Sequence, residues 1–170
     1  MLVPVVLRAI WTREFGWALL WCAIAGSTDA LDGFLARRLH ARSRFGEYLD
    51  PIADKLLLSG SYLVLGIRGL IPMWITLLVF GRDFLILTFA ALAFALTPAR
   101  SFPPTIWGKL STIVQVAAVL AVVVSGLLDW GRAFVFFALA CAVAATAWSA
   151  IHYFLIALRI VRGARVRAAH

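Results

Sequence analysis

The stretch that decides the fold reads DALDGFLAR over residues 29–37 and, after eight further residues, GEYLDPIAD over residues 46–54. This stretch holds five of the eight acidic residues of the chain, and four of these five are aspartates, namely Asp29, Asp32, Asp50 and Asp54. The surrounding sequence is strongly apolar. Ionisable groups at membrane depth are costly and usually face a protein interior or a water-filled cavity. Four acids gathered in such a setting therefore predict a cation site.

The composition indicates one integral membrane domain that covers residues 1–170. Hydrophobic residues make up 64% of the chain and charged residues 14%, whereas an average soluble domain has roughly 25% charged residues. A soluble core could not bury so much apolar surface. The net charge of +8 is better explained by a basic rim that meets anionic phospholipids than by nucleic acid, because no aromatic-and-basic nucleic-acid motif is present.

Apolar runs predict an all-α membrane protein with six transmembrane helices around a polar pocket. The first run, residues 1–11, is too short to cross a bilayer, which needs ~20 residues of helix. It is expected to be either a re-entrant piece or, as we favour, a truncated first helix. The other five helices are expected at residues 15–39, 45–66, 72–96, 105–128 and 133–157.

Loop charges predict that the acidic stretch lies toward the cytoplasm, because Lys and Arg are retained on that side of a membrane. If the helices alternate, the turns near residues 40 and 100 and the C-terminal tail share one face. The opposite face holds only Arg13, Arg68 and Arg132. The basic face holds Arg37, Arg38, Arg42, Arg44, Arg100, Arg159, Arg162, Arg165 and Arg167. We therefore expect a multi-pass protein of the inner membrane whose pocket faces the cytoplasm.

The four aspartates are predicted to converge on one pocket. If the second and third helices form an antiparallel hairpin that turns near residue 41, Asp32 and Asp50 lie at matching depths. Asp29 and Asp54 lie at matching depths one turn further in. Within each pair the spacing of three or four residues places both side chains on one helix face. Mg²⁺ and Mn²⁺ prefer carboxylate oxygen, and two such ions form the usual clamp for displacement at phosphorus.

Small and basic residues complete the predicted pocket. Gly33, Ala36 and Gly46 would let a bulky group approach the backbone, and Arg37 is placed to meet phosphate. A helix-end salt network with the nearby arginines is one alternative, which the regular spacing of the aspartates disfavours. A proton or cation pathway in a transporter is another. That pathway would require neither the small residues nor an arginine beside the acids.

The pattern DxxDGxxAR-x8-GxxxDxxxD over residues 29–54 resembles, without exception, the signature of the CDP-alcohol phosphotransferases, membrane enzymes of phospholipid synthesis. The resemblance implies that the four aspartates hold two Mg²⁺ or Mn²⁺ ions and that Asp54 is also the general base. It implies that Gly33, Arg37 and Ser43 contact the CDP moiety of the donor. Members of the family are commonly homodimers, so a homodimer is expected.

Two other stretches, residues 81–83 and 107–112, look like those of the bacterial branch that uses glycerol 3-phosphate. In that branch Arg82 and Lys109 would bind the phosphate of the acceptor. The resemblance implies transfer of a phosphatidyl group from CDP-diacylglycerol to glycerol 3-phosphate, which gives phosphatidylglycerophosphate and CMP. Asp83 departs from the glutamate that this branch would have after the arginine.

Alternatives to this assignment remain open from the sequence alone. A cardiolipin synthase that takes phosphatidylglycerol as its acceptor shares much of the same framework. A catalytically silent lipid-binding subunit of the membrane could retain the pocket without turnover. Arg82 could pair with Asp83 instead of a phosphate, and Lys109 could simply extend to the membrane surface.

Overall fold

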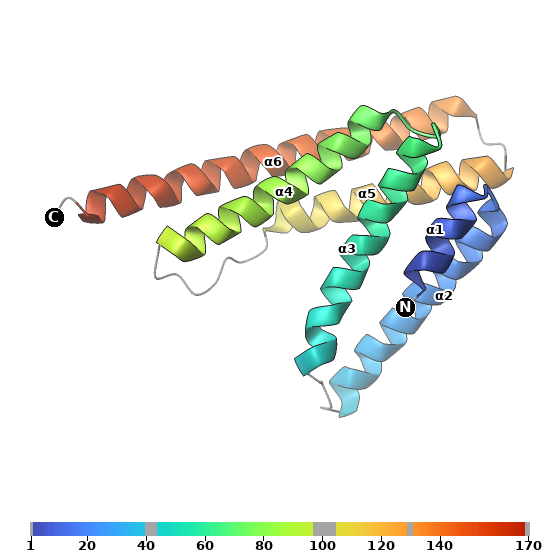
Figure 1. Ribbon diagram of the computed structural model, residues 1–170, viewed down its shortest axis with the longest axis horizontal. Helices are drawn as coiled ribbons and strands as arrows, with labels where there is room; N and C mark the ends of the chain where they lie inside the picture. The colour runs from blue at the N-terminus through green and yellow to red at the C-terminus, as the bar shows by residue number, and fades with distance from the viewer. Residues whose placement is uncertain (1, 40–43, 97–104, 129–130, 169–170) are drawn as a thin grey trace.

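The computed structural model describes residues 2–39, 44–96, 105–128 and 131–168, which form six helices and no strand. A short helix at the N-terminal end of the described chain is followed by long ones (Figure 1). The helices are α1 (Val3–Trp11), α2 (Phe15–Leu39), α3 (Arg44–Ile67), α4 (Met73–Leu96), α5 (Ile106–Leu128) and α6 (Arg132–Ala168). The all-helical prediction is confirmed for the described residues, and the expected short first segment is a helix of nine residues.

The short helix α1 begins where a proline is tolerated and buries one apolar face. Pro4 lies in its first turn, where its missing N–H would have no partner in any case. Val6, Ala9 and Ile10 are buried, and their spacing of three and four residues places them on one side of the helix. That side packs against α2 and α3. At 1.5 Å per residue, a helix of this length reaches only about half way across a bilayer.

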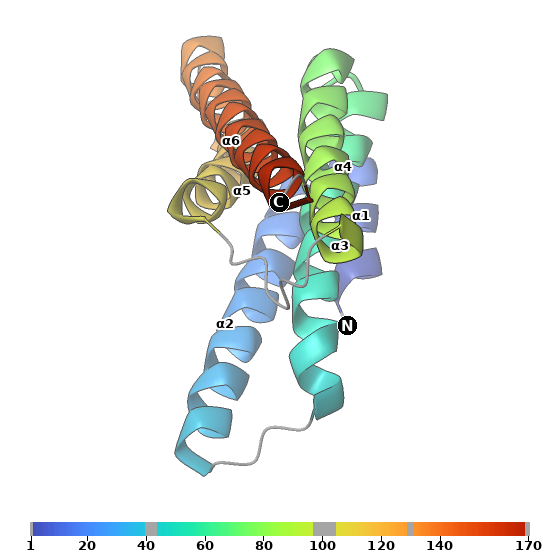
Figure 2. The same cartoon turned by 90° about the vertical axis from the view of Figure 1, so that its left-hand side faces the viewer.

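The long helices alternate in direction. Helices α2 and α3 run antiparallel to each other, as predicted, and α1 packs against both of them (Figure 1). Helices α4, α5 and α6 pack together, with α6 against both α4 and α5. Figure 2 shows that the C-terminal part of α2 and the N-terminal part of α3 extend away from this second group. The sequence-based prediction of which loops share one face of the membrane assumed this alternation.

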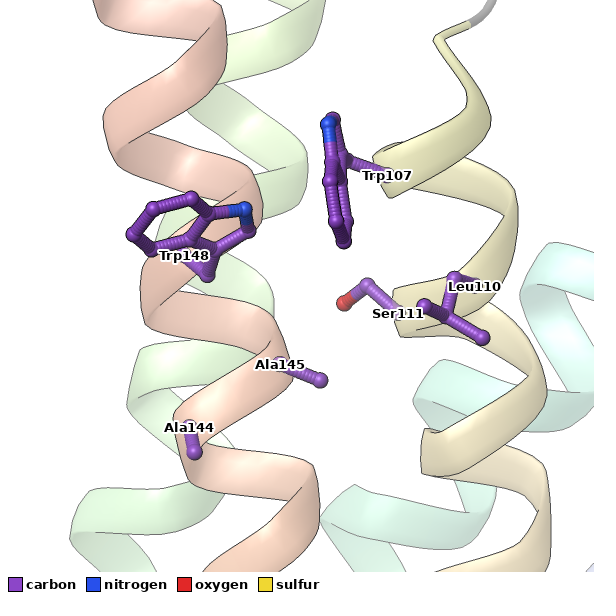
Figure 3. Close-up of a pocket in the computed structure, with 6 residues that line it drawn as sticks. All are labelled: Trp107, Leu110, Ser111, Ala144, Ala145 and Trp148. Carbon is purple, nitrogen blue, oxygen red and sulfur yellow. The ribbon is translucent and has the colours of Figure 1, made fainter.

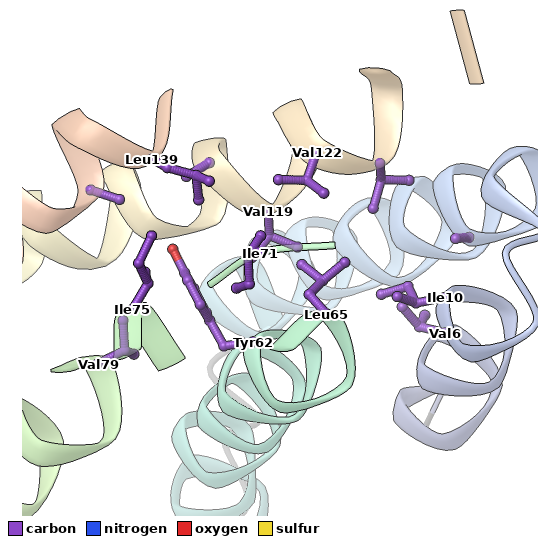
Figure 4. Packing of buried hydrophobic residues seen from close by; sticks show 14 of the residues in the cluster. Val6, Ile10, Tyr62, Leu65, Ile71, Ile75, Val79, Val119, Val122 and Leu139 are labelled. Atoms are coloured by element: carbon purple, nitrogen blue, oxygen red, sulfur yellow. The ribbon is translucent and has the colours of Figure 1, made fainter. Parts of the chain in front are cut away.

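The core joins the two groups of helices. Tyr62 and Leu65 of α3 are fully buried beside Ile75 and Val79 of α4 and Val119 of α5 (Figure 4). Large apolar side chains are also exposed over the outside of the molecule. Since lipid is as apolar as these side chains, apolar burial gives little drive for helices to associate in a membrane. Specific packing and polar contacts must therefore determine how the helices fit together.

Buried hydrogen bonds supply such contacts. Thr76 Oγ1 on α4 donates to the carbonyl oxygen of Tyr62 at 2.9 Å. The hydroxyl of Tyr62 donates to the carbonyl oxygen of Gln115 on α5 at 3.1 Å. Gln115 Nε2 donates to Thr146 Oγ1 on α6 at 2.8 Å. One chain of polar contacts thus connects α3, α4, α5 and α6, and each interhelical bond contributes about 1 kcal/mol in a membrane.

Two helical segments in the described part of the chain, Ile106–Leu128 and Arg132–Ile156, are long and apolar enough to cross a membrane. They correspond to the last two expected spans. The helices at the other expected spans are present, but their passage through a membrane remains a prediction.

Candidate active site

Helices α2 and α3 carry most of the residues that the sequence singled out. Backbone positions on α2 are described for Asp29, Asp32, Gly33 and Arg37, and backbone positions on α3 for Asp50 and Asp54. Both helices are continuous through these positions, so each aspartate pair has the helical spacing that the prediction assumed. The side chains of Asp29, Asp32, Arg37 and Asp50 lie outside what the structure describes, as does the whole of Ser43. Their convergence on one pocket stays a prediction.

The donor set on these two helices suits a hard cation. It consists of carboxylates alone, and Mg²⁺ and Mn²⁺ select oxygen ligands. Among the side chains that the structure describes, no three of the types His, Cys, Asp and Glu lie close enough to hold a metal ion. Of the four aspartates only Asp54 belongs to that set, and its side chain is exposed on α3. The candidate centre therefore depends mainly on aspartates whose side chains lie outside the described part of the structure.

Beside this region, a buried arginine on α4 connects three helices. Arg82 has only 7% of its surface exposed. Its Nη2 donates to Ser149 Oγ on α6 at 3.0 Å and to the carbonyl oxygen of Gly108 on α5 at 3.3 Å. Its Nε also donates to Ser149 Oγ, at 3.3 Å. The planar fork of a guanidinium can serve several acceptors at once, so Arg82 is held in one position relative to α5 and α6.

The remaining partner of Arg82 is its neighbour in the chain. Arg82 Nη1 donates to Asp83 Oδ1 at 2.8 Å, which is the pairing that the sequence left open as an alternative. The same oxygen lies 3.3 Å from Lys55 Nζ on α3. Burying a guanidinium is costly unless it is paired and hydrogen-bonded, and this carboxylate supplies the countercharge. Whether Arg82 also binds an acceptor phosphate stays a prediction.

An aromatic ring and a glycine complete the surroundings of Arg82. The ring centre of Tyr153 on α6 lies 5.9 Å from Arg82 Cζ, close enough for a cation–π contact. The hydroxyl of Tyr153 accepts a hydrogen bond from the backbone N–H of Thr105 at 3.2 Å. A Cβ atom at Gly108 would lie 2.6 Å from that hydroxyl. A side chain at this position would therefore have to displace the hydroxyl end of Tyr153.

Lys109 follows Gly108 on α5 and is exposed. Its backbone N–H bonds to the carbonyl oxygen of Thr105 at 3.1 Å, so it stands in the first turn of the helix. Its neighbour Gly108 is the residue whose carbonyl accepts from Arg82. Lys109 and Arg82 thus belong to one region of the molecule, although only the lysine is accessible.

A cavity of about 320 Å³ opens between α5 and α6 near this region. Its walls are almost entirely apolar, and Figure 3 shows the indole rings of Trp107 and Trp148 on its two sides. The two rings meet edge to face, with their centres 5.9 Å apart. Ser111 Oγ, which is buried without a hydrogen-bond partner, is directed toward the space between the helices (Figure 3).

Three residues of this region were not predicted from the sequence: Lys55, Ser149 and Tyr153. A signal for the last two was present, because Thr146, Ser149 and Tyr153 recur every three or four residues in a largely apolar part of the sequence. Such spacing places polar groups on one face, and polar groups at membrane depth usually face the protein interior. Lys55 directly follows an aspartate of the signature, but nothing in the sequence indicates its partner on α4.

Known proteins resemble this chain over most of its length. The family model of CDP-alcohol phosphatidyltransferase matches residues 1–148. The chain is similar to a probable phosphatidylglycerophosphate synthase of Mycobacterium tuberculosis strain H37Rv, with 33% identity over 99% of this chain and 81% of that protein.

Other relatives carry two kinds of name. The chain is 36% identical to a CDP-diacylglycerol--glycerol-3-phosphate 3-phosphatidyltransferase of Bacillus subtilis, over 61% of this chain and 53% of that protein. It is 33% identical to the human cardiolipin synthase (CMP-forming), over 89% of this chain and 57% of that protein. No solved structure gives a significant match.

Proposed function

We propose that this chain, which belongs to the CDP-alcohol phosphatidyltransferase family, transfers a phosphatidyl group from CDP-diacylglycerol to glycerol 3-phosphate. The products are phosphatidylglycerophosphate and CMP. The observation that carries the proposal is the complete signature over residues 29–54 on two antiparallel helices. Relatives named for this reaction, among them the protein of Mycobacterium tuberculosis, support it.

The reaction forms one bond and breaks one bond at the phosphorus that bears the diacylglycerol. Asp54 accepts the proton of the acceptor hydroxyl, whose oxygen then attacks this phosphorus. The bond between the phosphorus and the bridging oxygen of the diphosphate breaks, and CMP leaves with that oxygen. Two Mg²⁺ or Mn²⁺ ions bound to the four aspartates of the signature would neutralise the charge that develops on the diphosphate. Gly33, Arg37 and Ser43 hold the CDP moiety in this proposal.

The acceptor phosphate is assigned to Arg82 and Lys109. Arg82 is held by Asp83, Ser149 and the carbonyl of Gly108. Because Lys55 lies beside the same carboxylate, Arg82 and Lys55 share one countercharge and the group keeps a net positive charge. Lys109 is exposed and binds the phosphate directly. A fixed charge in a region of low dielectric attracts an anion more strongly than the same charge in water.

The second candidate is cardiolipin synthesis, in which phosphatidylglycerol is the acceptor. The human cardiolipin synthase is as similar in identity as the protein of Mycobacterium tuberculosis, and Asp83 departs from the residue expected in the glycerol 3-phosphate branch. Both acceptors carry a phosphate, so the same two cations serve either one. In both cases we place the enzyme in the inner membrane as a homodimer with its site toward the cytoplasm.

Release of CMP by the purified protein tests the proposal. The protein is incubated in detergent with Mn²⁺, CDP-diacylglycerol and labelled glycerol 3-phosphate, and CMP and labelled lipid are measured. We expect both products, and neither from the Asp54→Asn variant, whereas Glu14→Gln in the exposed loop before α2 retains activity. Turnover with phosphatidylglycerol alone would favour the second candidate. A lack of CMP with every acceptor would instead identify a silent lipid-binding subunit.

A further inference from the structure

Asp83 binds two cations through a single carboxylate oxygen. Its Oδ1 accepts a hydrogen bond from Arg82 at 2.8 Å and lies 3.3 Å from Lys55 Nζ. Arg82 is its neighbour on α4, whereas Lys55 stands on α3. Asp83 is 13% exposed and Lys55 is 43% exposed, so the interaction lies at the edge of the buried cluster. The carboxylate therefore links the helix that carries Asp54 to α4.

The position of this carboxylate is itself determined by other contacts. Arg82 donates to Ser149 on α6 and to the carbonyl of Gly108 on α5. Its guanidinium thus has one position relative to three helices, and Asp83 is bound to that guanidinium. Lys55 in turn takes its position from Asp83. Without the carboxylate, two cations would lie close together, one of them buried, and they would repel each other.

Lys55 directly follows Asp54 on α3, and this adjacency connects the ion pair to the residue that takes the proton in the proposed reaction. Successive side chains of an α-helix point about 100° apart, because one turn has 3.6 residues. A contact that fixes the direction of Lys55 therefore fixes the direction of Asp54 as well. The N-terminal part of α3 extends away from α4, α5 and α6 (Figure 1). If α3 rotates about its axis at Lys55, the residues of α3 that precede Lys55 therefore rotate with it.

We propose that Asp83 is a positioning residue for the transfer reaction. By holding Lys55 it sets the rotation of α3, so that Asp54 points toward the acceptor hydroxyl. This inference rests on the proposed function, in which Asp54 takes the proton of that hydroxyl. Proton transfer requires the two groups to be within hydrogen-bond reach. A misdirected Asp54 therefore lowers kcat while the affinity for the substrates changes little.

The first test is the variant Asp83→Asn, which removes the charge and keeps the shape of the side chain. We expect kcat to fall about 10-fold or more, because small errors of position are costly in catalysis, while KM for CDP-diacylglycerol changes by less than about two-fold. Asp83→Glu, which keeps a carboxylate, should retain most of the activity, and Glu14→Gln is the matched control. A purely electrostatic role predicts the opposite pattern, with a lower KM for the anionic acceptor and an unchanged kcat. That result would overturn the proposal.

The second test removes the partner. Lys55→Met keeps much of the length of a partly exposed side chain, so it is expected to fold even if Asp83→Asn does not. We expect a loss of kcat similar to that of Asp83→Asn, and no further loss in the double variant, because both changes break one interaction. An unchanged kcat in Lys55→Met, or losses that multiply in the double variant, would refute the proposal.

A third measurement does not depend on turnover. In a chain with Cys22→Ala, Cys141→Ala and Asp54→Cys, the new thiol reacts with a maleimide at a rate set by its exposure. We expect Asp83→Asn to change this rate several-fold and Glu14→Gln to leave it unchanged. If the natural protein released no CMP, the proposed function would fail, while this rate would still decide the link between Asp83 and the direction of residue 54. Equal maleimide reaction rates with and without Asp83→Asn would argue against that link.

Discussion

The hydroxyl of Tyr153 occupies the space where a side chain at Gly108 would begin, since a Cβ atom there would lie 2.6 Å from it. We predict that Gly108→Ala pushes the tyrosine ring away from Arg82 and lowers stability by about 1–3 kcal/mol, the usual cost of overpacking. The matched control is Gly81→Ala, because nothing lies within 4 Å of that position. Thermal unfolding in detergent measures both variants. An equal or higher stability of Gly108→Ala would contradict the observed packing.

Ser149 accepts hydrogen bonds from two nitrogens of a buried guanidinium. Its replacement by alanine leaves Nε of Arg82 without an acceptor and Nη2 with only the carbonyl of Gly108, and an unsatisfied buried polar group costs about 1–3 kcal/mol. We predict a lower unfolding temperature for Ser149→Ala. Ser59, which is half-buried on α3, provides a control in Ser59→Ala. Equal unfolding temperatures for the two variants would show that Ser149 contributes little.

Lys109 and Arg82 should respond differently to replacement, because only Lys109 is exposed. We predict that Lys109→Ala raises KM for the phosphate-bearing acceptor and leaves both kcat and the unfolding temperature near their original values. Arg82→Ala should raise the same KM and also lower the unfolding temperature, since it removes contacts to α5 and α6. Initial rates at varied acceptor concentration measure the effect. An unchanged KM in both variants would remove the acceptor-site assignment.

Asp54 is exposed on α3, so its replacement should not disturb the core. We predict that Asp54→Asn reduces CMP release by at least ~10²-fold, the lower range for loss of a general base. Near-normal turnover in this variant would eliminate the general-base role.

Removal of divalent ions should abolish turnover if the four aspartates hold a metal centre. We predict no CMP release after treatment with EDTA and recovery on addition of Mn²⁺ or Mg²⁺, because both ions suit carboxylate ligands. Asp29→Asn and Asp50→Asn should weaken the binding of Mn²⁺, which electron paramagnetic resonance measures without any turnover. Full activity in the presence of the chelator would exclude a metal-dependent reaction.

Helix positions could be predicted closely from the apolar runs. The third run was expected over residues 45–66, and α3 spans Arg44–Ile67. The last run was expected to end near residue 157, whereas α6 continues to Ala168. The difference has a physical reason, because arginine and alanine are good helix formers and a tail rich in them extends the helix.

The signature predicted which helices carry the candidate site, but not how Arg82 is held. Its contacts with Ser149 and Tyr153 depend on the rotation of α4 against α6. Apolar residues lie on most sides of both helices, so the sequence pattern does not show which sides meet. The contact between Lys55 and Asp83 could not be predicted for the same reason. A contact between residues of two different helices does not produce a repeating pattern in the sequence.

The length of α6 has a further consequence for the molecule in its membrane. A helix of 37 residues is about 55 Å long, whereas the hydrocarbon layer is only ~30 Å thick. If the apolar segment that ends at Ile156 crosses the bilayer, the last turns of α6 extend beyond the hydrocarbon layer and lengthen the helix on that side of the membrane.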